Sequence, residues 1–258
     1  MFGFLGPNGA GKSTTIRLLL ALIRATRGHA EILGVPTTDV ERAHRHVGYV
    51  AGEVALWPQL TGRETLELLG NVSRRVDVAF RDELVERFGV DPDRRIRSCS
   101  KGNRQKIALV AALMTRPKVL LLDEPTAGLD PIMEAEFQSV AREAAARGQT
   151  LFLSSHILDE VEDLCDRVAI LREGRLVEVA TLDDLRAMRT TVVEVHLDGP
   201  VPALDGVPGV TAVTPVPGGV RLSVVGSPGP LLRRLAELPV TTLRTEEPSL
   251  EEIFLTYY

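Results

Sequence analysis

The sequence predicts an α/β fold followed by a small C-terminal α+β domain. Short apolar strands alternate with helical segments along residues 1–187, and polar residues directly follow several of those strands. Such alternation is typical of a parallel sheet covered by helices. After residue 188 the pattern changes to strands separated by proline and glycine turns. We therefore expect one domain over residues 1–187 and a second over residues 190–258.

Composition and charge exclude several classes of protein. Of the 258 residues, 44% are hydrophobic and 25% are charged, which is typical of a folded chain with an ample core. The net charge of -5 gives no basic excess for binding nucleic acid, so nucleic acid is not expected as a partner. Cys99 and Cys165 are far apart, which favours free thiols in a reducing compartment. The longest apolar stretches are shorter than the ~18 residues that span a bilayer, and we expect a cytosolic protein.

The first fourteen residues carry the strongest motif. An apolar strand over residues 1–5 leads into the pattern G-x-x-x-x-G-K-S, and an apolar-periodic helix continues through Ile23. This context is that of a phosphate-binding loop, in which glycines let backbone N–H groups converge on anionic oxygens at a helix N-terminus. Lys12 would reach the β- and γ-phosphates, and the Ser13 hydroxyl would bind Mg²⁺. The predicted binding residues are Gly6, Pro7, Asn8, Gly9, Ala10, Gly11, Lys12, Ser13 and Thr14.

Two acidic residues end another strand. The continuous apolar run 119–122 predicts a parallel strand covered on both faces, and Asp123 and Glu124 follow at its carboxyl end, where ligands gather in open α/β sheets. Asp123 suits Mg²⁺ binding, while Glu124 could take a proton from an attacking water. His156 follows the next strand and either senses the γ-phosphate or is a hydrogen-bonded structural histidine.

Helical segments are predicted after Thr61, over residues 71–97 and from Ser100 to Met114. Thr61 is placed to cap one helix, and Ser100 is a plausible N-cap of another, whose free N–H groups could hold an anion. Trp57, the single tryptophan, is either a partner anchor or a packed residue. Residues 71–97 are expected to be mostly helical, with a buried stripe of Phe80, Leu84, Val85 and Phe88.

Other segments carry weaker signals. His44 and His46 lie two residues apart without a third ligand nearby, so packing or solvated roles are favoured over a metal site. A helix over 157–164 has an acidic run that is most simply a solvated face, and a hairpin follows around Glu173. In the second domain we expect strands at 192–197, 210–213, 220–225 and 240–243 and helices at 231–238 and from Ser249 onward.

The ordered motifs together resemble an ABC-type ATPase over about residues 1–187. They are the phosphate loop, Ser100-Lys101-Gly102-Asn103, Leu122-Asp123-Glu124, Gly128-Leu129-Asp130 and Ser155-His156. The resemblance implies a P-loop core with an inserted helical subdomain at about 56–114, and two copies that dimerise head to tail. In such a dimer the motif of residues 100–103 would contact the γ-phosphate held by Lys12 of the other copy. Glu124 would be the hydrolytic base, His156 the switch and Asp130 a contact across the dimer.

More specifically, the chain is similar to the ATP-binding subunit of a bacterial multidrug or antibiotic exporter of the daunorubicin-resistance type. This resemblance implies ATP and Mg²⁺ as cofactors and a separate integral membrane permease. It also implies a peripheral location on the inner face of the cell membrane. Two alternatives are a soluble ABC-type ATPase of DNA repair or translation, and a non-hydrolysing or truncated regulator.

The chain departs from this family's pattern at three places. Lys101 replaces a glycine of the usual LSGGQ, and Gly52 stands where a glutamine is usual, beside Glu53, whose carboxylate could replace the amide oxygen. The usual N-terminal strands and the aromatic residue that stacks on adenine are expected to be missing. Because Phe2 and Phe4 are on a buried strand, we expect ATP affinity to be weakened by about 0.5 to 1.5 kcal/mol.

Overall fold

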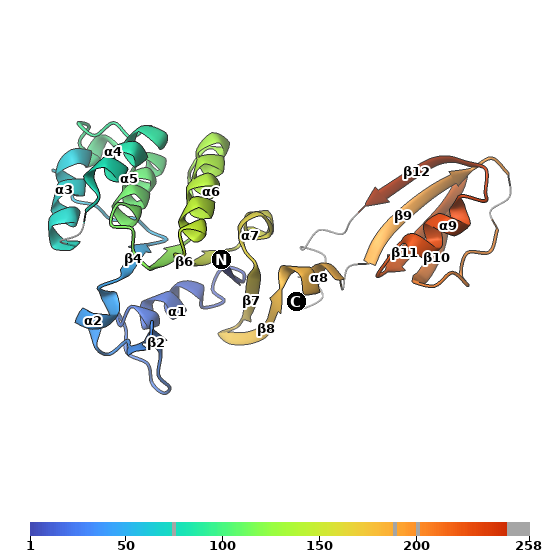
Figure 1. Cartoon of the computed structure of the whole chain (residues 1–258), viewed down its shortest axis with the longest axis horizontal. Coiled ribbons are helices and arrows are strands. Elements are labelled where there is room, and N and C mark those ends of the chain that lie inside the picture. The colour runs from blue at the N-terminus through green and yellow to red at the C-terminus, as the bar shows by residue number, and fades with distance from the viewer. Residues whose placement is uncertain (74–75, 188–189, 200–201, 247–258) are drawn as a thin grey trace. The chain divides into compact units, whose positions relative to one another are not determined.

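The computed structural model describes residues 1–73, 76–187, 190–199 and 202–246 (Figure 1). It divides into two compact units, Met1–Val179 and Ala180–Tyr258. This division falls earlier than the expected boundary at residues 187 to 190, so that the helix α8 (Leu182–Ala187) lies in the second unit. Within the described residues no helix combines the length and the apolar character needed to cross a membrane.

A six-stranded sheet forms the centre of the first unit, with the strand order β4-β5-β6-β1-β7-β8. The pairs β4–β5, β5–β6, β6–β1 and β1–β7 are parallel, which confirms the predicted α/β fold. Every residue of β5 is buried, as a strand between two parallel neighbours requires. The strands are β1 (Phe2–Leu5), β4 (Val47–Val50), β5 (Val119–Asp123), β6 (Thr150–Ser155), β7 (Arg167–Arg172) and β8 (Arg175–Thr181).

Helices and a small hairpin accompany this sheet. The helix α1 was expected to continue to Ile23, but it ends at Leu19 because Ala21 adopts a left-handed backbone with φ 50°. The remaining elements are α1 (Lys12–Leu19), β2 (Glu31–Ile32), β3 (Val35–Pro36), α2 (Val40–His44), α6 (Pro131–Ala146) and α7 (Leu158–Leu164).

The segment around residues 56–114 contains α3 (Gly62–Ser73), α4 (Val78–Arg87) and α5 (Lys101–Leu113), with a short 3₁₀ turn at Ile96–Ser98. Both α3 and α4 contact α5 (Figure 1). Thr61 and Glu64 exchange side-chain-to-backbone hydrogen bonds, which confirms the predicted cap of α3. Residues 71–97 are less helical than expected, because α4 ends at Arg87 before Gly89, which has φ 56°.

Aromatic contacts hold β1 against β6. The Phe2 and Phe4 rings lie 5.7 and 5.2 Å from the Phe152 ring, centroid to centroid. Both rings are therefore used in packing, as expected for residues on a buried strand.

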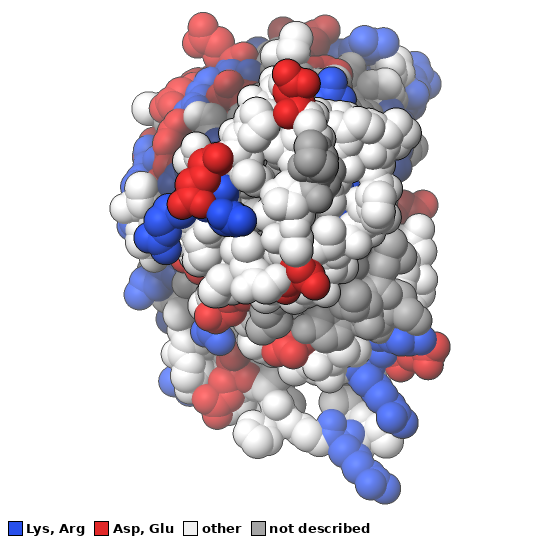
Figure 2. Space-filling model, turned by 90° about the vertical axis from the view of Figure 1, so that its right-hand side faces the viewer, with Lys and Arg blue, Asp and Glu red and all other residues white. Residues whose placement is uncertain are grey.

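The second unit is an antiparallel sheet of four strands in the order β10-β11-β9-β12. They are β9 (Thr190–Leu197), β10 (Val210–Val216), β11 (Gly219–Val225) and β12 (Val240–Glu246), and α9 (Gly229–Leu235) buries Leu231 and Leu235 in their core. On the face of the molecule drawn in Figure 2, much of the surface is formed by residues other than Lys, Arg, Asp and Glu. The helix expected from Ser249 lies outside the described residues.

Candidate functional site

The predicted phosphate loop joins β1 to α1 and depends on glycine at three positions. Gly9 and Gly11 have φ values of 83° and 107°, which favour glycine, and Gly11 is the N-cap of α1. A Cβ atom on Gly6 would lie 2.6 Å from the Leu171 carbonyl oxygen of β7. Gly6 is thus required by close packing against β7, and Gly9 and Gly11 by their left-handed backbone conformation.

Lys12 lies between this loop and the carboxylates at the end of β5. Its side chain is 5% exposed, and Nζ donates to the Gly6 carbonyl at 2.6 Å and to the Pro7 carbonyl at 3.2 Å. The same nitrogen is 3.8 Å from Glu124 Oε1. Burial lowers the pKa of Lys12, while the nearby charges of Glu124 and Asp123 oppose that shift.

The predicted acids and histidine are brought together at the ends of β5 and β6. Asp123 is buried and accepts a hydrogen bond from Ser154 Oγ at 2.5 Å. Glu124 has a left-handed backbone, φ 47°, and its N–H donates to the Ser154 carbonyl at 3.1 Å. The Glu124 Oε1 atom is 3.1 Å from His156 Nδ1. This geometry joins Lys12, Glu124 and His156 in one continuous set of polar contacts.

Gly52 lies beside these acids. A Cβ atom built on it would be 3.2 Å from Asp123 Oδ2, so a side chain at this position would begin next to the buried carboxylate. Glu53 is exposed. Burial and the nearby Asp123 carboxylate raise the pKa of Tyr49, a residue that the sequence did not single out.

The motif of residues 100–103 begins α5 and packs on the loop that follows Glu124. Ser100 Oγ accepts from the Asn103 N–H at 3.2 Å, which confirms the predicted N-cap. A Cβ atom on Gly102 would lie only 2.4 Å from the Gly128 carbonyl oxygen. Gln105, which the sequence did not reveal, is buried and donates from Nε2 to the Pro125 carbonyl at 2.8 Å. In the described part of the chain, the hydrogen bonds of Lys12 go to its own loop and not to this motif.

Asp130 occupies the N-cap of α6. Its Oδ1 atom accepts from the Met133 N–H at 3.0 Å, and Pro131 begins the helix. The residue expected to act across a dimer therefore also has a role within its own chain.

Glu160 corrects one expectation from the sequence. The acidic run on α7 was expected to be a solvated face, but Glu160 is 8% exposed and accepts from Thr126 Oγ1 and from Ser155 Oγ. The helical periodicity contained this signal, because Glu160 lies four residues before the buried Leu164 and so on the same face of α7. A cavity of about 260 Å³ is lined by residues that include Glu124, Thr126, Glu134, His156 and Glu160.

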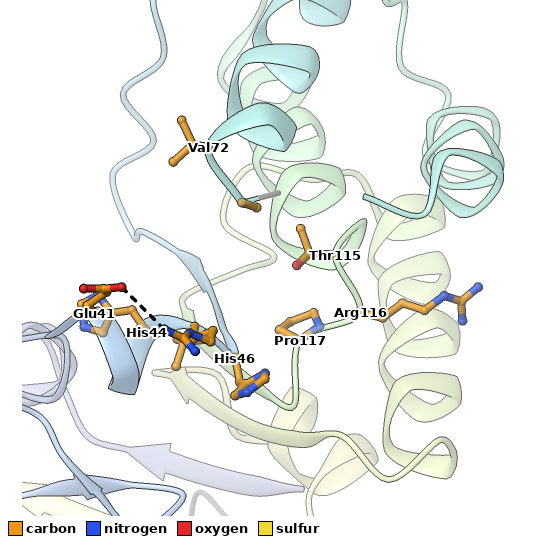
Figure 3. Close-up of a pocket in the computed structure, with 10 residues that line it drawn as sticks. Glu41, His44, His46, Val72, Thr115, Arg116 and Pro117 are labelled. Carbon is orange, nitrogen blue, oxygen red and sulfur yellow. Dashed lines mark ion pairs between the residues drawn. The ribbon is translucent and has the colours of Figure 1, made fainter. Parts of the chain in front are cut away.

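A separate cleft of about 660 Å³ lies between α2 and the start of β4 on one side and the ends of α3 and α5 on the other. Figure 3 shows His44 and His46 facing it, with Glu41 paired to Arg45, while Arg116 points away. Arg116 pairs instead with Asp77 at 2.8 Å. The described residues contain no group of three or more His, Cys, Asp and Glu side chains suited to a metal.

A parallel sheet, a glycine loop between β1 and α1, and a buried lysine at the start of α1 define a P-loop nucleotide-binding domain. Residues 1–127 match the family described as ABC transporter, and residues 181–258 match the C-terminal domain of DrrA1-3-like ATP-binding proteins. An uncharacterized ABC transporter ATP-binding protein of Alkalihalophilus pseudofirmus is 35% identical, with 97% of each chain aligned. This chain therefore belongs to the ABC transporter ATP-binding proteins.

Two relatives carry more specific names. The daunorubicin resistance ATP-binding protein DrrA3 of Streptomyces coeruleorubidus is 40% identical over 72% of this chain and 60% of its own length. The bacitracin transport ATP-binding protein BcrA of Bacillus licheniformis is 37% identical over 76% of this chain and 66% of its own length. The chain spans 60 to 65% of the length of DrrA3 and of three other ABC transporter ATP-binding proteins that it matches.

Solved structures agree on the fold of the first unit. The ATP-binding subunit of an ABC transporter superposes with a TM-score of 0.67 at 33% identity, covering 72% of this chain and 80% of that one. A dimeric ATP-binding cassette bound to ADP and Pi has a TM-score of 0.62 at 23% identity, covering 70% and 85%, and supports the fold alone.

Proposed function

We propose that this chain binds and hydrolyses ATP as the ATP-binding subunit of an exporter with a separate membrane permease. The observation that carries the proposal is the contact between Glu124 and His156 at the strand ends, with Lys12 3.8 Å from the same Glu124 oxygen. A lysine for phosphate, a carboxylate base and a histidine thus meet at the carboxyl edge of a parallel sheet, where ligands gather.

The ATP phosphates are bound by the loop of residues 6–14. Its glycines permit backbone N–H groups to converge on anionic oxygens, and α1 adds the partial positive charge of its N-terminus. Lys12 bonds two carbonyls of the loop, so it would exchange at least one of them for a phosphate oxygen. Because phosphate charge stabilises the ammonium form, binding would also raise the pKa of Lys12 that burial lowers.

Ser13 and Asp123 are the residues that would hold Mg²⁺. A hydroxyl and a carboxylate are the hard oxygen ligands that this ion prefers, and it usually retains water and phosphate oxygens as its other ligands. The pair therefore fits the ion without a larger protein cluster, and none is present among the described side chains. When bound, Mg²⁺ would neutralise charge on the phosphates.

Glu124 acts as the general base toward the attacking water, and His156 orients it or senses the γ-phosphate. Their 3.1 Å contact leaves Glu124 partly exposed, with 28% of its side chain accessible, so that water can reach the carboxylate. A base of this kind contributes about 10²-fold to 10⁴-fold to a rate.

A second copy of the chain completes the site. Residues 100–103 are the segment we assign to the partner's γ-phosphate, and Asp130 to the contact across the dimer. The α5 N-terminus supports this assignment, because Ser100 and the following N–H groups form a capped helix start with a basic residue, Lys101, beside it.

The permease docks on the cleft between α2, β4 and α3. Exposed apolar side chains lie on α3 and in the loop before it: Val72 is 74% exposed, Trp57 49% and Leu68 39%. Val72 also lines the cleft (Figure 3). Exposed apolar side chains, with Val72 among the residues that line the cleft, are typical of a protein interface. Export of an antibiotic is the function we infer from the resistance and transport named for DrrA3 and BcrA. A subunit with this function would lie at the inner face of the membrane.

The test is Mg²⁺-dependent ATP hydrolysis by the full chain and by Glu124→Gln. We expect the variant to lose at least about 10²-fold in rate while it still binds ATP, because only the base is removed. Asp159→Asn, which changes an exposed acid on α7, is the control. Equal rates for wild type and Glu124→Gln would contradict the proposal.

A non-hydrolysing regulator is the second candidate, favoured by Gly52 in place of glutamine. It would be supported if the wild type binds ATP without turnover, both alone and with its permease.

A further inference from the structure

We propose that Glu160 is a positioning residue that holds His156 and the segment after Glu124 in the arrangement used for hydrolysis. This inference rests on the proposed function, in which Glu124 and His156 act on ATP. Glu160 lies on α7, outside every motif discussed above, and would act without touching the substrate.

Burial distinguishes Glu160 from the other acidic residues of α7. Its side chain is 8% exposed, whereas the adjacent Asp159 is exposed. A carboxylate loses its hydration on burial, and this is unfavourable unless hydrogen-bond donors replace the water. A buried glutamate is therefore expected to have specific partners.

Those partners are two hydroxyls from different strand ends. Thr126 Oγ1 donates to Glu160 Oε1, and Ser155 Oγ donates to Glu160 Oε2 at 2.7 Å. One carboxylate oxygen of Glu160 thus holds the segment that follows β5, and the other holds the last residue of β6. Hydrogen bonds to a charged acceptor are stronger than those between neutral groups, which suits a structural clamp.

Ser155 transmits this clamp to His156. Its hydroxyl donates to Glu160 and also accepts from the Ile157 N–H at 2.9 Å, so the residues on both sides of His156 are fixed by one oxygen. The backbone of His156 is thereby held in place, and this positions its ring for the 3.1 Å contact with Glu124.

Thr126 transmits the clamp to the other side of the site. It lies two residues after Glu124, whose left-handed backbone is further held by the bond from the Ala127 N–H to the Glu124 carbonyl at 3.1 Å. Pro125, which lies between Glu124 and Thr126, connects this loop to α5, because its carbonyl accepts a hydrogen bond from Gln105 Nε2. One buried carboxylate therefore connects His156, the Glu124 loop and, through that loop, the helix that begins with residues 100–103.

The experiment compares kcat and KM for ATP in wild type, Glu160→Gln and Asp159→Asn. Glutamine keeps the size of the side chain but replaces one acceptor oxygen with a donor group, so it cannot accept hydrogen bonds from both hydroxyls as Glu160 does. We expect Glu160→Gln to lose about tenfold to 10²-fold in kcat with a KM within about threefold of wild type, because small displacements of reacting groups have effects of this size. Asp159→Asn should retain wild-type values.

Thr126 provides a paired test of the mechanism. Thr126→Val removes the hydroxyl at nearly constant shape and should lower kcat, while Thr126→Ser keeps the hydroxyl and should recover most of the loss. Combined with Glu160→Gln, Thr126→Val should add little further loss, since both changes break the same bond.

The ring proton shifts of His156 give a readout without turnover. NMR spectra should show them displaced in Glu160→Gln and unchanged in Asp159→Asn, with thermal unfolding confirming that both variants are folded. Wild-type kcat in folded Glu160→Gln, fully additive losses or unchanged His156 shifts would overturn the inference. If Glu124→Gln hydrolyses ATP as fast as wild type, the proposed function fails instead, and the NMR result still decides whether Glu160 positions His156.

Discussion

At the scale of single residues, Gly52 is the position where a side chain would most directly change the site. Its built Cβ lies 3.2 Å from Asp123 Oδ2, a tight contact that requires a shift of a few tenths of an ångström. Its φ is not in the left-handed region, so a larger residue is compatible with the backbone. A glutamine here would place an amide beside the acids at the end of β5.

We expect Gly52→Gln to raise kcat for ATP hydrolysis by about threefold to tenfold, because the amide can orient the attacking water and contact bound Mg²⁺. Steady-state ATPase assays check this. Glu53→Gln is the informative companion: a large loss there, with no gain in Gly52→Gln, would mean that the Glu53 carboxylate already serves this role.

Glu134 is a residue whose ionisation opposes folding. Burial raises its pKa above the usual value, and the nearby charges of Glu160 and Asp130 act in the same direction. Because the folded state holds this proton more tightly than the unfolded state, the ionised form costs stability above the folded pKa, and that cost disappears below the unfolded pKa.

Glu134→Gln should therefore raise the midpoint of thermal unfolding at pH 7, and its advantage should vanish below about pH 4. Thermal melts across this pH range measure both effects, with Asp159→Asn as the exposed control. A gain that persists unchanged at low pH would contradict the electrostatic cause.

At the scale of elements, one arginine joins α4 to α6. Arg87 contacts Glu136 at 2.5 Å, Glu143 at 2.8 Å and Glu83 at 3.3 Å, with 22% of its side chain exposed. These contacts raise the pKa of Arg87, and the hydrogen bond from Arg87 lowers the pKa of Glu143. They link the helical segment 56–114 to the helix that Asp130 caps.

Arg87→Met should lower the free energy of unfolding by about 1 to 2 kcal/mol, since it removes the shared partner of three glutamates, of which Glu143 still pairs with Arg147, while solvent screens part of the loss. Urea denaturation at pH 7 measures this. Arg45→Met, at an exposed pair with Glu41, should change stability by less than about 0.5 kcal/mol.

The effect should also depend on pH. A lowered carboxyl pKa gives stability that is present above the unfolded value and is lost as pH falls through the folded value. The difference between wild type and Arg87→Met should accordingly shrink in acid. A difference that grows in acid would contradict this assignment.

At the scale of the whole molecule, the two units have separate hydrophobic cores. The second unit buries its own cluster on β9, β11 and α9, which includes Val195, Leu222 and Leu231. The nucleotide site proposed here lies entirely in residues of the first unit. Units with independent cores need not unfold together.

Calorimetry of the Glu124→Gln chain should resolve two unfolding transitions, of which only one shifts upward with Mg²⁺ and ATP. At a ligand concentration near 100 times Kd, the stabilisation of that unit is about 2.7 kcal/mol. Lys12→Ala should abolish the shift. A single transition that ATP moves as a whole would show instead that the two units unfold cooperatively.

Local sequence was sufficient for the elements whose signals are local. The glycine loop, the apolar run of β5 and the caps at Thr61 and Ser100 each depend on residues a few positions apart. Element ends were harder to predict, as at α1, because one left-handed residue such as Ala21 ends a helix that periodicity would continue.

The sequence by itself determined the fold class, the family and the order of the motifs, because phosphate loops and strand-end acids require particular residues at fixed spacing. The tertiary structure decided which of those residues meet. Glu124 and His156 are adjacent because β5 and β6 pair in parallel, and Glu160 is buried because α7 turns that face toward the same strand ends. Contacts of this kind depend on register and helix orientation, which no single segment of the sequence encodes.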